Sequence, residues 1–499
     1  MTDLVALDGR AVGQRLEADT DVVVIGSGPA GATVAADLAH RGVRVIVVEE
    51  GHHHRPADFV ASGLAAMAGL YRDMGTSLAF GNLPMPYLQG VAVGGTSVIN
   101  GAICWQLPPA ILAEWAAADP PLADALPPEV IAAHQTRLEA RLHVAPTAPA
   151  VAGVKNLLLA RSADLLGVAH RPIRRNAFGC VGAGRCLQGC PHGAKLSMDR
   201  TLLPDAVADG ARIFAGLRAE RIEVDGRRAR AVHGVTAGGA RFVIRARVAV
   251  VVAASAIQTP CLLLKSGLRH GPVGDGLMAH PGVGVTGRFD TPVRGWAGAT
   301  QGHEVTGYRA EGLKLEALGF DLSILASRVP GVGADFARRL TELDRYACWG
   351  AAIRAGGRGR VRPGRHRARV RYSLTPDDLR RARRAVRILC EHLFAAGAVE
   401  VYPGIAGFDP VIRDRAALAR LEAEAPLAPA GYAMSMTHLF GTARMGADPA
   451  TSVVRPDFRH HTVAGLYVAD SSVFPTNLGV NPQIAIMALA ARCAEHVGA

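Results

Sequence analysis

The first fifty residues follow a hydrophobic pattern that predicts a strand, a helix and a second strand. Apolar runs at 22–25 and 45–48 flank a glycine-rich turn and an amphipathic, alanine-rich segment. Uninterrupted apolar runs of this length are typical of strands that are buried on both faces of a parallel sheet. We therefore expect one βαβ unit over residues 21–51.

The rest of the chain changes its pattern several times. Glycine- and proline-rich loops and then Pro/Ala-rich helices run to about residue 165. Strands return over 166–285, including a hairpin with Asp225 and Gly226 in its turn. Over 286–430, strands that alternate polar and apolar residues precede a helix that Thr375 is expected to cap. The final segment returns to a buried strand and a closing helix.

This order predicts a dinucleotide-binding domain that is assembled from distant segments, with a second domain inserted into it. The expected fold class is α/β, with a Rossmann-like first domain and an α+β, antiparallel-sheet second domain. We expect the first domain to span 1–285, with lid or linker segments at 52–165, and the substrate-binding domain to span 286–430. The chain is then expected to return to the first domain over 431–499, the segment that should carry the catalytic residues.

The charge balance changes this picture little. The net charge is +12 and the pI is about 9.7, but the arginines are spread through the chain. The densest run, 358–371, alternates arginine with other residues, which favours the solvated face of edge strands. The chain has no zinc-finger, RNP or helix-turn-helix signature, so we expect no nucleic-acid partner.

Compartment and membrane association follow from equally simple features. The amino terminus has no export signal, and the apolar runs are too short to span a bilayer. Eight cysteines in a chain of 499 residues without such a signal predict a reducing compartment and no disulfide framework. We therefore expect a cytoplasmic protein without a membrane span.

The turn after the first strand carries the most specific motif. Gly26, Gly28 and Gly31 form GxGxxG between a strand and a helix, where backbone N–H groups can bind a pyrophosphate. Glu49 ends the next strand and can accept hydrogen bonds from ribose hydroxyls. A carboxylate at this place disfavours NADP, but the βαβ unit alone leaves FAD and NAD equally open.

Four further stretches together resemble the glucose–methanol–choline (GMC) flavoprotein oxidoreductases. They are "VGGTSVING" (93–101), "SAIQTPCLLLKSGL" (255–268), "GDGLMAHP" (274–281) and the carboxyl-terminal block from "HLFGTARMG" to "IAIMALAARCA". The second departs from the family pattern only in that Arg269 follows where glycine is usual. Because these stretches cover nearly the whole chain in the family's order, the resemblance implies FAD and a flavin domain of the p-hydroxybenzoate-hydroxylase type.

The resemblance also implies how the cofactor is held. Family members with covalently linked flavin have a histidine where this chain has Ile99, so we expect non-covalent FAD, with Asn100 against the flavin ring. Asp470 resembles a residue near the ribityl and pyrophosphate groups, although capping of the following turn is an alternative. The cofactor-binding residues that we expect are Gly26, Ser27, Gly28, Pro29, Ala30, Gly31, Glu49, Glu50, Gly94, Gly95, Thr96, Ser97, Asn100, Gly101, Ala254, Asp470, Ser471, Asn481 and Pro482.

One histidine and one asparagine are the expected catalytic residues. His438, three residues before a Gly-Thr pair, and Asn481, before the last helix, match the family's substrate-facing pair. An imidazole suits removal of a hydroxyl proton, and an amide N–H can stabilise the developing oxyanion. His280 is expected to shape the flavin pocket, whereas 52–54 and 460–461 are expected to be loop or surface histidines.

Cys180, Cys186 and Cys190 form a C-x5-C-x3-C-P segment. It resembles a loop of sugar dehydrogenases and long-chain alcohol oxidases that in some members holds an iron–sulfur cluster, but Val181 replaces a cysteine that is common there. Three thiolates could still bind iron. A cysteine-rich loop with buried free thiols is the interpretation we favour, so no metal is expected.

Taken together, the sequence predicts an FAD-dependent oxidoreductase that oxidises a CH–OH group of an alcohol, sugar, polyol or sterol-like substrate to a carbonyl. Oxygen, a quinone or a protein carrier could accept the electrons. A non-redox lyase of the same family, or an electron-transfer subunit that uses the cysteine loop, are the alternatives. The sequence does not define the substrate or the oligomeric state.

Overall fold

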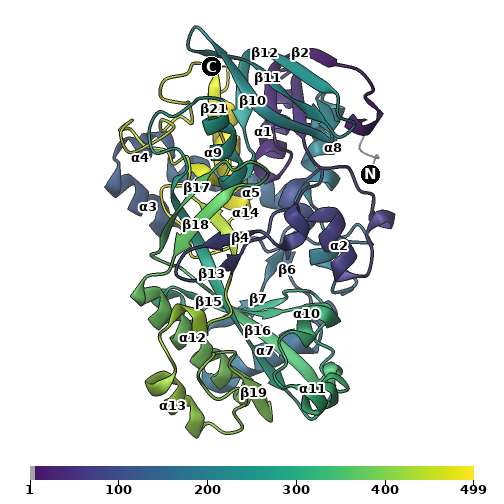
Figure 1. Ribbon diagram of the computed structural model, residues 1–499, viewed down its shortest axis with the longest axis vertical. Helices are drawn as coiled ribbons and strands as arrows, with labels where there is room; N and C mark the ends of the chain where they lie inside the picture. The colour runs from purple at the N-terminus through teal and green to yellow at the C-terminus, as the bar shows by residue number, and fades with distance from the viewer. Residues whose placement is uncertain (1–5, 499) are drawn as a thin grey trace.

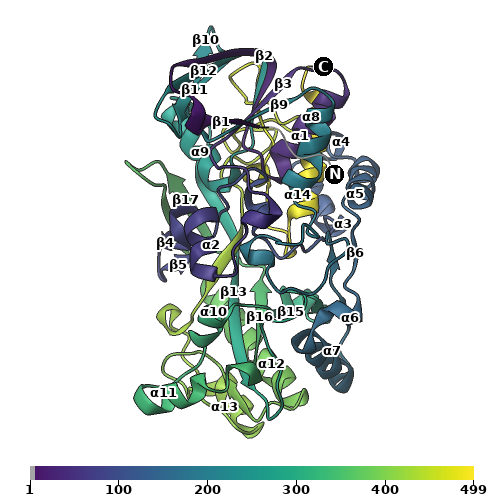
Figure 2. The same ribbon diagram turned by 90° about the vertical axis from the view of Figure 1, so that its right-hand side faces the viewer.

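A computed structural model describes residues 6–498. Two β-sheets lie one above the other along the longest axis of the molecule (Figures 1 and 2). Segments from both ends of the chain share the upper part, where helix α1 (Pro29–His40) packs beside helix α14 (Gln483–His496). The middle of the chain forms most of the lower part. Both sheets have a buried apolar core of their own.

The upper sheet contains the predicted βαβ unit. Its order is β1-β9-β3-β2-β12-β11-β10, with β21 beside β12. All pairs are parallel except those that join β10, β11 and β12, where the chain makes the hairpin predicted around Asp225. The strands are β1 (Ala6–Asp8), β2 (Leu16–Ile25), β3 (Val45–Glu49), β9 (Arg212–Ala215), β10 (Leu217–Asp225), β11 (Arg228–Thr236), β12 (Arg241–Val252) and β21 (Leu466–Val468).

The lower sheet is mostly antiparallel and is organised around the long strand β13 (Asp275–Arg288). Its order is β5-β4-β18-β17-β13-β16-β15-β14-β7, and β19 and β20 also pair with β13. The predicted domain boundary at 285 lies inside β13, and the domain division stays a prediction. The other strands are β4 (Leu78–Phe80), β5 (Met85–Pro86), β7 (His170–Pro172), β14 (His303–Val305), β15 (Leu313–Leu318), β16 (Tyr346–Ile353), β17 (Arg358–Arg362), β18 (Arg369–Ser373), β19 (Glu400–Tyr402) and β20 (Ser435–Phe440), while β6 (Ala145–Pro146) pairs with β8 (Arg174–Arg175) apart from both sheets.

Helices cover both sheets. The predicted cap of α12 is confirmed, since the Thr375 hydroxyl accepts from the Asp378 N–H and the Asp378 carboxylate accepts from the Thr375 N–H. Apolar residues on one side of α12 then pack on β13 and β16. The remaining helices are α2 (Gly63–Leu70), α3 (Pro109–Ala118), α4 (Pro121–Ala125), α5 (Pro128–Arg141), α6 (Pro149–Ala152), α7 (Val154–Leu166), α8 (Leu202–Ala208), α9 (Ser255–Lys265), α10 (Leu322–Ala326), α11 (Gly333–Leu340), α12 (Pro376–Ala395) and α13 (Ala416–Glu424). Among residues 6–498, no helix is long and apolar enough to cross a membrane.

The arginine-rich run forms strands, but the prediction that they are edge strands is wrong. β17 lies between β13 and β18, and β18 also pairs with β4. Arg358, Arg360 and Arg371 are exposed, so the predicted solvated face is confirmed. The alternating pattern reports which face meets solvent, and it carries no information about the neighbours of a strand.

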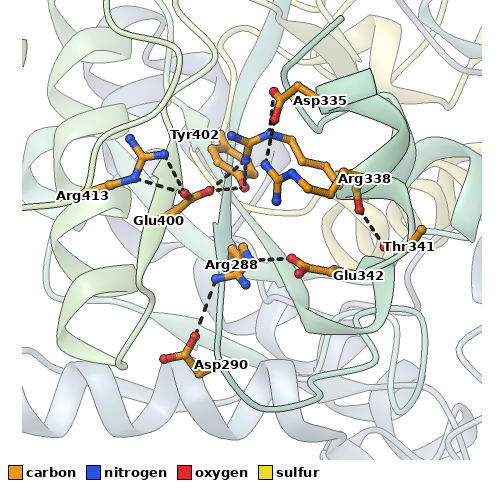
Figure 3. Close-up of polar contacts among 10 residues, drawn as sticks. Arg288, Asp290, Asp335, Arg338, Thr341, Glu342, Glu400, Tyr402 and Arg413 are labelled. Carbon is orange, nitrogen blue, oxygen red and sulfur yellow. Dashed lines mark hydrogen bonds and ion pairs between the residues drawn. The ribbon is translucent and has the colours of Figure 1, made fainter. Parts of the chain in front are cut away.

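A polar cluster ties helix α11 to β19 at the far end of the lower part (Figure 3). The buried guanidinium of Arg339 donates to Asp335, Glu400 and the Tyr402 hydroxyl. Arg413 also donates to Glu400, so both carboxylate oxygens have partners. This cluster holds the end of the lower sheet together at a distance from the GxGxxG turn of the upper part (Figure 1).

Three histidines outside the predicted site are buried, among them His460, which was expected at the surface. His460 lies in the loop before β21 and is 3% exposed. His392 lies on the buried face of α12, where its Nδ1 and Nε2 contact the hydroxyls of Ser162 and Tyr308. Burial lowers the pKa of His303, His392 and His460 to about 4.

We expect these rings to make the stability of the fold fall in mild acid. The unfolded chain binds protons as the pH drops below about 6.5, whereas the folded rings stay neutral down to about pH 4. Each fully buried ring therefore lowers the free energy of unfolding by up to about 1.4 kcal/mol per pH unit in this window. Denaturant unfolding of His392→Gln at pH 7 and 5 should show a smaller loss than the parent protein, and equal losses would contradict the assignment.

Candidate active site

The GxGxxG turn forms a cradle that opens toward a second glycine loop. Gly26 has a φ of 101° and lies so close to Ala253 that a Cβ would overlap its carbonyl oxygen. A Cβ on Gly31 would overlap the carbonyl oxygen of Gly26, so this glycine lets α1 pack against the turn. Gly28 differs, because its nearest neighbour beyond the adjoining residues would be Gly95 Cα, at 3.9 Å. Space therefore remains beside Gly28 at the amino terminus of the helix.

Through Ser27, the carboxylate of Glu49 connects the GxGxxG turn with the loop that contains Gly94. Its Oε2 accepts from the Ser27 N–H at 3.0 Å and from the Ser27 hydroxyl at 2.7 Å, and its Oε1 accepts from the Gly51 N–H at 2.8 Å. The Ser27 hydroxyl oxygen in turn accepts from the Gly94 N–H at 3.0 Å. Burial, with the charge of Glu50, raises the pKa of Glu49. The side chain of Glu50 is turned to the Arg72 guanidinium, with which it forms an ion pair.

The 94–101 loop is held in place by a buried lysine, Lys195, which lies outside the motifs described above. The ammonium of Lys195 donates to the carbonyls of Val98, Asn100 and Cys186 at 2.6, 3.0 and 2.7 Å. Burial lowers the pKa of Lys195 to about 8. All three ammonium hydrogens therefore have acceptors, and they join this loop to the cysteine segment.

We expect Lys195→Met to destabilise the protein by about 3 kcal/mol or more and to reduce its FAD content, because three buried carbonyls lose a charged donor. Lys265→Met, at the exposed end of α9, is the matched control and should change neither quantity by a measurable amount. Denaturant unfolding and the flavin absorbance of the purified variants measure both effects. Equal stability of the two variants would show that Lys195 is dispensable.

Asp470 connects α9 with the turn that follows β21. Its buried carboxylate accepts from the N–H groups of Ser255 and Ser472, at 2.9 and 2.8 Å, and from the Thr259 hydroxyl at 2.5 Å. Burial raises its pKa. The turn-capping alternative is therefore present in the structure, and a direct role at the cofactor stays a prediction. Ala254 immediately precedes α9, and Pro482 immediately precedes α14.

His438, His280 and Asn481 come together although they lie far apart in the sequence. His438 is on β20 and His280 is on β13, and these strands pair. The two Nδ1 atoms are 3.1 Å apart, and His438 Nε2 lies 3.3 Å from Asn481 Nδ2. The Gly479 N–H donates to His280 Nε2 at 2.9 Å, which orients the His280 ring. The structure thus brings the two predicted catalytic residues into contact and adds His280 behind them.

The surroundings keep both rings neutral. Burial, and then the positive charge of Lys314, lower the pKa of His438 to about 3. Burial also lowers the pKa of His280 well below its usual value. A neutral imidazole can accept a proton at pH 7, as a general base requires.

The residues present fit a bound dinucleotide. Among residues 6–498, the buried polar atoms without a hydrogen-bond partner include Asn481 Oδ1 and, two residues further along the chain, Gln483 Nε2. Buried polar groups are rarely left unpaired, so these atoms are suited to contact a ligand. The open space at Gly28 and the free N–H groups of α1 offer the matching site for a pyrophosphate.

The prediction that the three thiols of the 180–190 segment are buried is wrong, because this loop lies at the surface and leaves each of them partly exposed. Cys180 Sγ accepts from Arg175 and Gly182, whereas Cys190 Sγ accepts from the Lys195 N–H. All eight cysteines are free, and three of them, those of this segment, are partly exposed. In the described part of the chain, no group of three or more histidine, cysteine, aspartate or glutamate side chains is placed to hold a metal ion.

Two family models match the chain over the segments that build this site. Both are described as GMC oxidoreductase, and they match residues 21–282 and 357–490. The chain belongs to the GMC oxidoreductase family. It is therefore a flavin-dependent oxidoreductase with FAD as cofactor, and the expected Rossmann-like domain with a second, substrate domain is confirmed.

Relatives with different names share this family. A GMC-type oxidoreductase of Mycobacterium tuberculosis is 37% identical over 95% of this chain and 75% of its own length. A long-chain-alcohol oxidase of Arabidopsis thaliana is 30% identical over 95% of this chain and 66% of its own length. Paromamine 6'-oxidase of Streptomyces fradiae is 30% identical over 96% and 91% of the two chains.

Solved structures show the same fold at low identity. Pyridoxine 4-oxidase from Mesorbium loti has a TM-score of 0.69 at 18% identity and covers 95% of this chain and 98% of its own. A formate oxidase has a TM-score of 0.68 at 18% identity, with 96% and 98% of the two chains covered. Their different names indicate that one fold serves different substrates.

Proposed function

We propose that the protein oxidises a CH–OH group of an alcohol to a carbonyl, with His438 as the base and Asn481 as a hydrogen-bond donor. The contact between these two side chains, 3.3 Å apart, is the observation that carries the proposal. The relatives named long-chain-alcohol oxidase and paromamine 6'-oxidase support the proposal, since the first is named for oxidation of an alcohol and the second is also named as an oxidase. FAD, when bound, supplies the acceptor for the hydride.

The roles of the side chains follow from their environment. His438 is neutral and takes up the hydroxyl proton of the substrate at Nε2, the nitrogen on the side of Asn481. An amide N–H of Asn481 donates to the substrate oxygen as negative charge develops on it, and this amide does not itself titrate. His280 orients the base from behind, through the contact between the two Nδ1 atoms.

The first test is anaerobic addition of alcohols to the FAD-loaded protein. We expect loss of visible flavin absorbance with at least one primary or secondary alcohol, followed by its return when oxygen or a quinone is admitted. Full FAD content without bleaching by sugars, polyols, aliphatic alcohols or sterols would overturn the proposal and favour a non-redox member of the family.

We further propose that FAD is bound without a covalent link, since Ile99 offers no nucleophile. Acid precipitation of the purified protein should then release all of the flavin into the supernatant. Flavin that remains in the protein pellet would contradict this proposal while leaving the oxidation chemistry intact.

A further inference from the structure

A set of buried charges crosses one face of the lower sheet beside the catalytic histidines. Arg171 on β7 lies opposite Glu304 on β14, which lies opposite Glu316 on β15. Directly opposed residues point to the same face of a sheet. Lys314 points to this face too, because it lies two positions from Glu316 on β15. The Lys314 ammonium lies 2.6 Å from Glu316 and 3.1 Å from Glu304.

Such a set is costly to bury. Lys314 is 1% exposed and Glu304 is 0% exposed. Removing each charge from water costs several kcal/mol, and pairing commonly recovers no more than this cost. Apolar side chains at these sheet positions would stabilise the fold about equally well, so packing alone does not account for the charges. Glu316, which is 9% exposed, is the member of the set that can meet a polar ligand.

A series of contacts leads from these charges toward the catalytic pair. The Gln301 amide donates to Glu316 at 2.7 Å, and its oxygen lies where a Cβ on Gly101 would be. The neighbouring Asn100 amide donates to Gln483 at 2.5 Å, and Gln483 is two residues after Asn481. The charged set and the catalytic base therefore border one continuous polar wall.

Small residues separate the charges from His280. Lys314 lies opposite Ala352, which lies opposite Gly282, two residues along β13 from His280. A Cβ on Gly282 would meet no atom closer than 3.4 Å. No bulky side chain of these three strands therefore stands between the ammonium and the histidine pair along this row.

One cation near this wall has no carboxylate of its own. Arg309 lies with its guanidinium 4.5 Å from the centre of the Trp105 ring, and Arg171 lies 4.2 Å from the same ring. The Trp105 N–H donates to Glu304 at 2.9 Å. Within residues 6–498 Arg309 forms no ion pair, and its Nη1 is buried without a hydrogen-bond partner. Arg309 is thus suited to receive an anionic group from a ligand.

We propose that the substrate is a polyhydroxylated alcohol that carries a carboxylate or phosphate group. Glu316, held in place by Lys314 and Glu304 behind it, binds its hydroxyls, and Arg309 binds its anionic group. An aliphatic alcohol would cover these charges without making hydrogen bonds, and sites built for hydrogen bonding reject such analogues strongly. The substrate class rests on the alcohol oxidation proposed above.

The test is the rate of anaerobic flavin reduction in the FAD-loaded protein with four substrate sets. These are sugar acids, sugar phosphates, neutral sugars or polyols, and linear alkanols. We expect at least one anionic set to react with a kcat/KM at least about 10²-fold above that of the alkanols. The comparison of sugar acids with sugar phosphates identifies the anionic group.

Arg309→Gln should raise the KM for the preferred anionic substrate about 10- to 100-fold, with a much smaller effect on neutral polyols, because a charged hydrogen bond is lost. Arg371→Gln, on the exposed face of β18, is the matched control and should leave both unchanged. Two results would overturn the proposed substrate class. One is a kcat/KM for alkanols equal to that for the anionic polyols, and the other is an Arg309→Gln variant that raises the KM of all substrates alike. If no alcohol bleaches the flavin, the proposed oxidation itself fails.

Discussion

Replacement of His438 by alanine is expected to slow alcohol-dependent flavin reduction by about 10²–10⁴-fold, the usual contribution of a positioned general base. The variant should bind FAD fully, because none of the protein contacts at the two glycine loops involves this side chain. Anaerobic stopped-flow measurement of flavin absorbance, together with the flavin-to-protein ratio, separates the two quantities.

His366→Ala is a suitable control, since His366 is exposed in the loop between β17 and β18. It should react at the parent rate. An alanine variant at 438 that retains the parent rate with full flavin content would show that another group removes the proton.

The second large effect is expected at the glycine cradle, where two alanine substitutions should fail for different reasons. In Gly31→Ala the new Cβ overlaps the carbonyl oxygen of Gly26, so α1 must move away from the turn. We expect a loss of about 1–3 kcal/mol in the stability of the apoprotein, together with loss of FAD. In Gly28→Ala the Cβ has room in the protein and φ is −67°, so the apoprotein should keep its stability.

Gly28→Ala should nevertheless lose most of its FAD, because the Cβ occupies the space through which a pyrophosphate approaches the backbone. Thermal unfolding of the two apoproteins and titration with FAD distinguish the effects. Normal FAD affinity of Gly28→Ala would place the pyrophosphate elsewhere.

The sequence predicts the upper part of the molecule well because its determinants are local. A buried strand, a glycine turn and an amphipathic helix follow one another within thirty residues, and each can be recognised alone. The cap of α12 is equally local, since Thr375 and Asp378 are three residues apart. The family motifs also allow His438 and Asn481 to be predicted from the sequence, although the contact between the two side chains depends on the fold.

The lower sheet is less predictable because its pairing is not local. β13 pairs with β16, β17, β19 and β20, and nothing in the alternation of polar residues specifies these partners. The same reason explains why the cluster of Lys314, Glu304 and Glu316 was missed: only the strand register brings its members together. Lys195 lies outside the motifs described above, and its three carbonyl acceptors come from two separate segments.

The hydrogen bond from the Gly479 backbone to His280 determines which ring nitrogens of His280 and His438 carry hydrogen. A peptide nitrogen can only donate, so Nε2 of neutral His280 holds a lone pair and its hydrogen sits on Nδ1, directed at Nδ1 of His438. The single hydrogen of the resting His438 is then on Nε2, the nitrogen that faces Asn481. The Asn481 amide fits best with its oxygen turned toward this hydrogen. This orientation gives the Asn481 oxygen a hydrogen-bond partner and frees the NH₂ group for the substrate. The base proposed above needs the other tautomer of His438, with its hydrogen on Nδ1, where it would face the Nδ1 hydrogen of His280. By fixing the tautomer of His280, the main-chain amide of Gly479 therefore opposes the basic tautomer of His438 in the resting site.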